Sequence, residues 1–284
     1  MGGADQIAFV STRSGAVEIW LMNIDGSGLR MITNISEGVC QPEWSPDGNK
    51  IIFISPCKRN MTSYPGASLF IMNADGSGLA PLPSVPGGDY DPSWSPDGKQ
   101  IAFTSLRMGG VPGIYIIDLD NYEVKSLVED ETRAIYQPAW SPDGSQIAYV
   151  NSDSRVWVMD TNGENRRSLI QGGGDYIVSG PAWSPDGTAV IFTQSVFSDT
   201  TGSTVLMAVS YTEDGAAPVE VPNSSLVTDA SYSFDGYWLL FTSWFSGSHD
   251  INIMRTNGID RRAIVADPAY DFDPAWRPYQ ITPP

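Results

Sequence analysis

The sequence predicts an all-β protein, a six-bladed β-propeller with four antiparallel strands in each blade. Three observations lead to this prediction. A heptad of the form Pro-x-Trp-Ser-Pro-Asp-Gly recurs along the chain, an apolar stretch follows the heptads at constant spacing, and the two ends of the chain carry complementary parts of one further repeat. Repeats with a period of roughly 40–50 residues are typical of propeller blades.

The heptad is the strongest of these observations. Four near-identical copies begin at Pro42, Pro92, Pro138 and Pro181, and a degenerate copy begins at Ala230. A sixth copy is cut short after Trp276. The aromatic residues of successive copies lie 43 to 50 residues apart: Trp44, Trp94, Trp140, Trp183, Tyr232 and Trp276.

Each repeat contains four candidate strands. The first carries Pro-x-Trp, and the second is the β-branched and aromatic run after Asp-Gly, as in residues 51–53. The third resembles residues 19–22, and the fourth is short, as in residues 30–33 or 167–170. Asp-Gly and Asn-Gly pairs between the third and fourth strands are typical of tight hairpins.

The ends of the chain predict how the ring closes. Residues 7–33 supply second, third and fourth strands without a first, and residues 272–277 supply a first strand with nothing after it. Joined in one sheet, they complete a sixth blade and leave no open edge. We therefore predict one domain over residues 6–278, with terminal tails at 1–5 and 279–284.

With these motifs the chain resembles the TolB-like six-bladed propellers with WD40-like (PD40) repeats. The resemblance covers about residues 6 to 278, and it is specific for fold but weakly specific for function. TolB-like propellers are typically exported and act as interaction platforms, which implies a periplasmic or extracellular protein. The companion domain that precedes the propeller in TolB is missing from this chain, so the partner chemistry of TolB does not follow.

The composition argues against several partners. The chain has 33 acidic and 16 basic residues and a formal charge of −17, which disfavours nucleic acid and anionic lipid. No apolar run approaches the roughly 18 residues that a membrane span needs, so we expect no membrane insertion. The first residues lack signal-peptide features, so we expect any signal peptide to be absent from this chain. We expect a monomer.

Loop lengths predict the binding face. The spacing from the first-strand to the second-strand aromatic is nine residues in every complete copy, whereas the spacing from second to third strand varies from 8 to 17. We therefore predict that the Ser-Pro-Asp-Gly residues of the uniform face form structural turns. The loops of the variable face are predicted to determine binding specificity. Its candidate binding residues are Arg59, Tyr64, Arg107, Phe197, Trp244 and Phe245. The alternative is that some of them fold back over the blade edges.

A second candidate site surrounds the central channel. The residues before the first-strand prolines should ring a channel mouth on the variable face: Gln41, Asp91, Gln137, Gly180, Asp229 and Asp273. Three carboxylates and two amides are oxygen ligands that suit calcium, so Asp91, Asp229 and Asp273 are candidate metal ligands. The alternative is a hydrated ring that binds the amides linking the blades.

Two cysteines, Cys40 and Cys57, lie in one blade and predict a disulfide, with two free thiols as the alternative. Catalysis has little support. His249 is the only histidine, which argues against a histidine-rich metal site, and no Gly-x-Ser-x-Gly motif is present. We therefore expect a non-catalytic propeller that binds a protein or peptide and requires no cofactor. The alternatives are the ligand-sensing ectodomain of a signalling protein and a carbohydrate-active enzyme.

Overall fold

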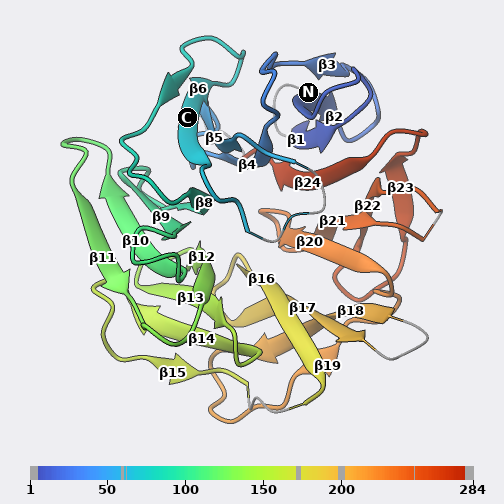
Figure 1. The fold of residues 1–284 in the computed structure, drawn as a ribbon. Coiled ribbons are helices and arrows are strands. Elements are labelled where there is room, and N and C mark those ends of the chain that lie inside the picture. Colours follow the sequence, from blue (N-terminus) through green and yellow to red (C-terminus); the bar gives the residue numbers. More distant parts are fainter. Residues whose placement is uncertain are drawn as a thin grey trace, which may run out of the picture.

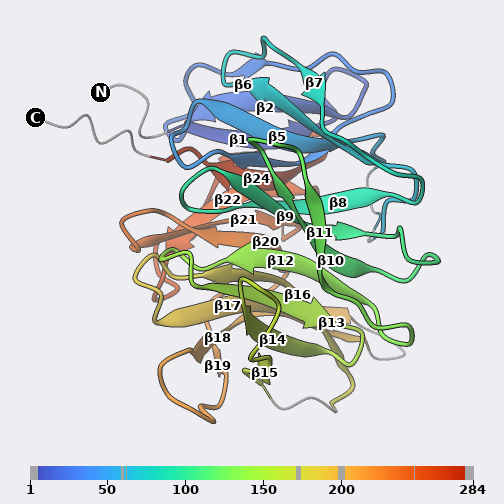
Figure 2. The same ribbon diagram turned by 90° about the vertical axis from the view of Figure 1, so that its left-hand side faces the viewer.

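The computed structural model confirms the six-bladed propeller. It describes residues 6–58, 61, 63–170, 174–197, 202–245 and 247–278, without the side chain of Phe197. Within these residues the regular elements are all β-strands, arranged in six antiparallel four-stranded sheets, and no helix is present that could cross a membrane. Figure 1 shows the sheets as blades around a central axis, and Figure 2 shows them from the side, with β15 and β19 opposite β7.

The strands of each blade are ordered from the axis outward. The first strands are β24 (Asp271–Trp276), β4 (Cys40–Trp44), β8 (Asp89–Trp94), β12 (Ile135–Trp140), β16 (Tyr176–Trp183) and β20 (Val227–Tyr232). The second strands are β1 (Gln6–Ser11), β5 (Lys50–Ser55), β9 (Gln100–Ser105), β13 (Gln146–Asn151), β17 (Ala189–Phe197) and β21 (Trp238–Ser243). The third strands are β2 (Glu18–Asn23), β6 (Ser68–Asn73), β10 (Gly113–Asp118), β14 (Arg155–Asp160), β18 (Gly202–Ser210) and β22 (Asp250–Arg255). The outer strands are β3 (Arg30–Met31), β7 (Ala80–Pro81), β11 (Val124–Val128), β15 (Arg167–Ser168), β19 (Val219–Glu220) and β23 (Arg262–Val265).

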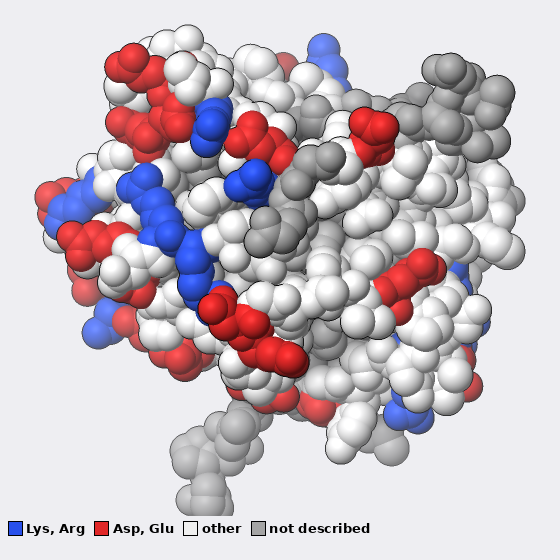
Figure 3. Space-filling view, turned by 90° about the horizontal axis from the view of Figure 1, so that it is seen from below, with Lys and Arg blue, Asp and Glu red and all other residues white. Residues whose placement is uncertain are grey.

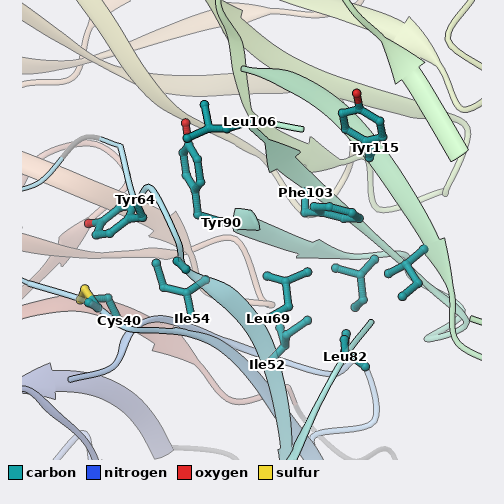
Figure 4. Packing of buried hydrophobic residues seen from close by; sticks show 14 of the residues in the cluster. Cys40, Ile52, Ile54, Tyr64, Leu69, Leu82, Tyr90, Phe103, Leu106 and Tyr115 are labelled. Carbon is teal, nitrogen blue, oxygen red and sulfur yellow. A yellow bond between two sulfur atoms is a disulfide. The ribbon is translucent and has the colours of Figure 1, made fainter. Parts of the chain in front are cut away.

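We number the blades I to VI, starting with β24 and β1–β3 as blade I and following the chain to β20–β23 as blade VI. The second strands form most of the core because each lies between two strands of its sheet and between two neighbouring sheets. Ile51, Ile52 and Phe53 in β5 are fully buried, as expected for a strand covered on both faces. Figure 4 shows one inter-blade cluster, in which Ile52 and Leu69 of blade II contact a layer containing Phe103 of blade III.

Blade I closes the ring as the sequence predicts. β24 is antiparallel to β1, with Ile7 opposite Trp276 and Val10 opposite Phe272. At the end of this pairing, the fully buried carboxylate of Asp271 accepts a hydrogen bond from Arg13 Nη2 at 2.8 Å. Removal of one partner of such a buried ion pair is strongly destabilising, because it leaves the other charge buried and unpaired. The two ends of the described chain are thus held together within one sheet (Figure 1).

The Ser-Pro-Asp-Gly segments are turns, as predicted. In the first copy, Asp47 Oδ1 accepts hydrogen bonds from Ser45 Oγ and from the backbone N–H of Asn49, at 2.5 and 3.0 Å. Gly48 has φ of 65°, a conformation that glycine adopts without a steric penalty. The same contacts recur after Ser95, Ser141, Ser184 and Ser233.

Two outer strands are shorter than predicted. β3 ends at Met31, and the next residue, Ile32, still donates from its N–H to the Ile19 carbonyl at 3.0 Å. The hydroxyl of Thr33 accepts a hydrogen bond from the Ile19 N–H at 2.8 Å and donates one to Glu18 Oε2 at 2.5 Å. A buried side-chain network thus replaces the edge of the sheet there. The β15 strand likewise ends at Ser168.

Candidate functional site

A ring of six residues surrounds the central axis, one from each first strand: Gln41, Asp91, Gln137, Gly180, Asp229 and Asp273. All six have φ between 47° and 58°, and each lies at a break in the pairing of its strand, which is the signature of a β-bulge. The bulge directs backbone N–H groups away from the ladder. Those groups therefore need acceptors from outside their own sheet.

Side chains of the preceding blade supply these acceptors at four of the six positions, three of them from ring residues and one from Thr104. Asp273 Oδ2 accepts from the Gln41 N–H at 2.9 Å, and Gln41 Oε1 accepts from the Asp91 N–H at 2.8 Å. Asp91 Oδ2 accepts from the Thr104 hydroxyl, which in turn accepts from the Gln137 N–H, each at 3.0 Å. Gln137 Oε1 accepts from the Gly180 N–H at 2.9 Å. The ring is thus a chain of inter-blade hydrogen bonds, and this explains why most of its members have acceptor side chains.

The three carboxyl groups of the ring have raised pKa values and ionise less readily than exposed carboxyl groups. Burial, with added repulsion from Asp229 and Asp91, raises the pKa of Asp273 to about 8. Burial also raises the pKa of Asp91 to about 6, although hydrogen bonds from Thr104 and Gln41 act in the opposite direction. The pKa of Asp229 is likewise raised by burial. The mutual repulsion of the three groups is therefore reduced by protonation.

The calcium hypothesis stays a prediction. Within the residues that the structure describes, no three His, Cys, Asp or Glu side chains form a group that could hold a metal ion. If calcium binds the ring, it should raise the melting temperature, because a ligand of the folded state stabilises it by mass action. Differential scanning calorimetry with calcium and with EDTA tests this, and the Asp91→Asn, Asp273→Asn double variant should lose the increment. Identical curves would mean that protonation alone neutralises the ring.

A large cavity extends from the ring along the first strands to the Ser-Pro-Asp-Gly turns. Its volume is about 1080 Å³. The inner-strand aromatic residues form its wall: Trp44, Trp94, Trp140, Trp183, Tyr232 and Trp276. Prolines of the turns, with Phe234 in the degenerate copy, form its rim: Pro46, Pro96, Pro142, Pro185 and Pro278. The cavity therefore belongs to the uniform face.

The expectation that the ring is a channel mouth on the variable face stays a prediction. Tyr64, a predicted binding residue of that face, is 8% exposed, and its ring lies 5.7 Å from that of Tyr90. Burial and the charges of the ring carboxyls raise the pKa of the Tyr64 hydroxyl well above its ordinary value. Tyr64 thus lies beside the ring. Its loop is also held by a disulfide between Cys40 and Cys57, whose Cα atoms are 5.7 Å apart.

Other candidates of the variable face divide into packed and exposed residues. Arg107 is packed, because it pairs with the buried carboxylate of Asp89 at 3.1 Å and its guanidinium lies 4.5 Å from the centre of the Tyr115 ring. Arg107 therefore agrees with the alternative interpretation, in which some loop residues fold back over the blade edges. Trp244 is partly exposed and Phe245 is 73% exposed. Arg59 and the side chain of Phe197 lie outside the described residues.

Comparison with known proteins identifies the family. The family model described as the TolB beta propeller domain (PD40) matches residues 4–226 and residues 116–281. The chain belongs to the TolB β-propeller family.

Solved structures show the same fold. TolB from Acinetobacter baumannii aligns with this TolB-family chain at a TM-score of 0.80 and 20% identity, over 98% of this chain and 68% of that one. A putative TolB from Agrobacterium tumefaciens aligns at 0.70 and 19% identity, over 94% and 89%. Oligogalacturonate lyase in complex with manganese aligns at 0.64 and 13% identity, over 92% and 74%. At these identities the alignments show a shared fold.

Curated relatives match only one repeat of the TolB-family propeller. The uncharacterized protein Atu1656 of Agrobacterium fabrum is 41% identical over 49 residues, which is 17% of this chain and 17% of that protein. The uncharacterized peptidase YuxL of Bacillus subtilis is 43% identical over 47 residues, or 16% and 7%. The chain thus matches a small part of the length of either relative, and their activities do not transfer with the repeat.

Sequence reasoning missed one acidic residue of this TolB-family cavity. Glu43 lies in the wall, beside Trp44 and Trp94. The signal was present in the heptads, because the residue after the first proline is Glu in the first copy and Ser or Ala in every other. Phe234 at the rim had a similar signal, since it replaces a proline of the motif.

Proposed function

We propose that this chain is a non-catalytic binding propeller that takes a protein or peptide segment into its central cavity. The observation that carries the proposal is the cavity of about 1080 Å³ with a wall of six aromatic residues. Ligand-binding cavities commonly measure roughly 300–1,000 Å³, and buried aromatic residues contribute much of the binding free energy at protein interfaces. Membership of the TolB propeller family supports a protein partner.

The character of the wall supports a peptide over a reacting substrate. The aromatic and proline rings offer broad apolar contact, whereas His249, the only histidine, lies on the other face with its ring 5.2 Å from that of Tyr270. The cavity wall therefore has no histidine to act as general base. The disulfide is typical of oxidising compartments, and it supports a periplasmic or extracellular location. We expect the protein to act as a monomer.

A peptide selection tests the proposal. A random-peptide phage library is panned on the purified chain, and the selected peptides are synthesised and titrated by isothermal calorimetry. Trp140 is partly exposed in the cavity wall, so Trp140→Ala should weaken binding by at least about tenfold, because an aromatic anchor contributes roughly 2 kcal/mol or more.

Phe245→Ala is the matched control, since Phe245 is exposed on the variable face. It should leave the affinity unchanged. A loss of binding in Phe245→Ala but not in Trp140→Ala would contradict the cavity as the site and place binding on the variable loops. Turnover of a glycan or peptide panel above buffer would contradict the non-catalytic assignment.

A further inference from the structure

We propose that the cavity selects a cationic group, the ammonium or guanidinium of a Lys or Arg side chain or of a free peptide N-terminus, and that Glu43 is its counter-ion. This inference rests on the proposed function and specifies the chemistry of the ligand. It is carried by an acidic side chain that the fold does not need, by its missing hydrogen-bond partner, and by the charge and aromatic content of the cavity wall.

Glu43 is dispensable for the blade. The equivalent positions of the other five repeats carry small residues: Ser93, Ala139, Ala182, Ser231 and Ala275. These blades have the same four strands and the same bulge next to this position. A Glu side chain in the wall of the cavity therefore adds a buried carboxyl that no other blade requires, at a cost in desolvation.

Only one of the two carboxyl oxygens of Glu43 has a hydrogen-bond partner among the described residues. Oε1 accepts a hydrogen bond from the Trp94 backbone N–H at 3.2 Å. Oε2 is buried and has no hydrogen-bond partner among the described residues. Burial raises the pKa of Glu43 to about 8. Because Oε2 is covered, the carboxyl must turn toward the cavity to meet a cation. A cation in contact with it would supply the missing partner and would favour the ionised form of the carboxyl.

The rest of the wall offers acceptors to a cation. Besides Glu43, the lining contains the carboxyl groups of Asp91, Asp229, Asp235 and Asp273, whose oxygens can accept hydrogen bonds in either protonation state, and no Lys or Arg belongs to its described residues. The outer side of the molecule differs, because acidic and basic residues are interspersed there (Figure 3). Tryptophan faces attract ammonium and guanidinium groups, and the cavity wall has five tryptophans.

The indole N–H groups do not select the ligand. Trp94 Nε1 and Trp183 Nε1 donate to backbone carbonyls of the preceding blades at 3.3 and 3.0 Å. The Nε1 atoms of Trp44, Trp140 and Trp276 have no acceptor among the described residues, but they are buried, and those of Trp20 and Trp157 outside the cavity are in the same state. The preference for a cationic group therefore rests on Glu43 and on the faces of the tryptophan rings.

A pair of selections tests this inference. The same random-peptide phage library is panned on the wild-type chain and on Glu43→Gln, which keeps the size of the side chain and removes its charge. Peptides selected on the wild-type chain should be enriched in Arg and Lys, and this enrichment should be lost on Glu43→Gln. Each basic peptide is then compared with its citrulline or norleucine version by calorimetry. Removal of the cationic group should weaken binding to the wild-type chain by at least about tenfold and should have little effect on binding to Glu43→Gln.

Two further variants keep the result interpretable. Glu43→Ala introduces the residue that three other blades carry at this position, so it should fold and should repeat the result of Glu43→Gln. Glu220→Gln removes an exposed charge from the outer strand β19 and should preserve the enrichment. Cavity-binding peptides without basic residues, or citrulline versions that bind equally well, would overturn the cation inference and leave the proposed function standing. A library that yields no Trp140-dependent binder would overturn the proposed function and this inference with it.

Discussion

Deletion of residues 271–284 is expected to remove most or all of the free energy of unfolding. It removes β24, whose register on β1 places residues opposite Ile7, Ala8 and Val10. These three residues are fully buried in the intact protein, so the deletion exposes an apolar strand edge and opens the ring between blades VI and II. Domains are commonly stable by only about 5–15 kcal/mol, and an open apolar edge promotes aggregation. Thermal melting and size-exclusion chromatography measure the two effects.

Complementation by a peptide is the control for this deletion. A synthetic peptide of residues 270–278 should raise the melting temperature of the shortened chain as its concentration rises, because it binds only the folded form. A peptide of the same composition in scrambled order should have no effect. A shortened chain that melts like the full chain without any peptide would contradict closure through β24.

The free energy of unfolding is expected to fall by several kcal/mol as the pH rises from about 5 to about 9. Burial raises the pKa of Glu43 and of Asp273 to about 8, and that of Asp91 to about 6. Such a carboxyl holds its proton more tightly in the folded state. Its stabilising contribution is complete below the ordinary pKa of about 4 and is lost as the pH rises through the folded-state value. Each group changes the stability by up to about 1.4 kcal/mol per pH unit in that window.

Urea unfolding at several pH values in EDTA measures this dependence. Two variants test whether the buried carboxyl groups cause it. Asp273→Asn keeps an oxygen that can accept from the Gln41 N–H and removes the titrating group, so its stability should be less dependent on pH and higher at pH of about 8. Asp97→Asn is the opposite case, because a hydrogen bond from Ser95 lowers the pKa of Asp97. It should lower the stability at neutral pH without altering the slope. An Asp273→Asn slope equal to that of the parent would contradict the assignment.

The blades and the ring could be predicted from sequence because both depend on local, repeated spacing. Gln41 and Asp273 lie next to a proline that five of the six first strands carry at the same position, so their shared level around the axis follows from the period alone. The position of Tyr64 does not follow from the period. It lies in a long loop, its ring meets that of Tyr90 in the next blade, and such a contact leaves no pattern in the heptads. Glu43 was not predicted because the motif was defined by the residues that the repeats share. The other five repeats carry Ser or Ala at this position.

The depth of the cavity limits the length of any bound segment. The cavity wall ends at the ring, and on the loop side the buried Tyr64 and Tyr90 lie beside it. From the ring to the rim the first strand advances five residues, as from Gln41 to Pro46, which is about 16 Å of extended chain. A bound peptide therefore has room for about five extended residues between the rim and the ring. A chain terminus or the tip of a protruding loop fits this depth.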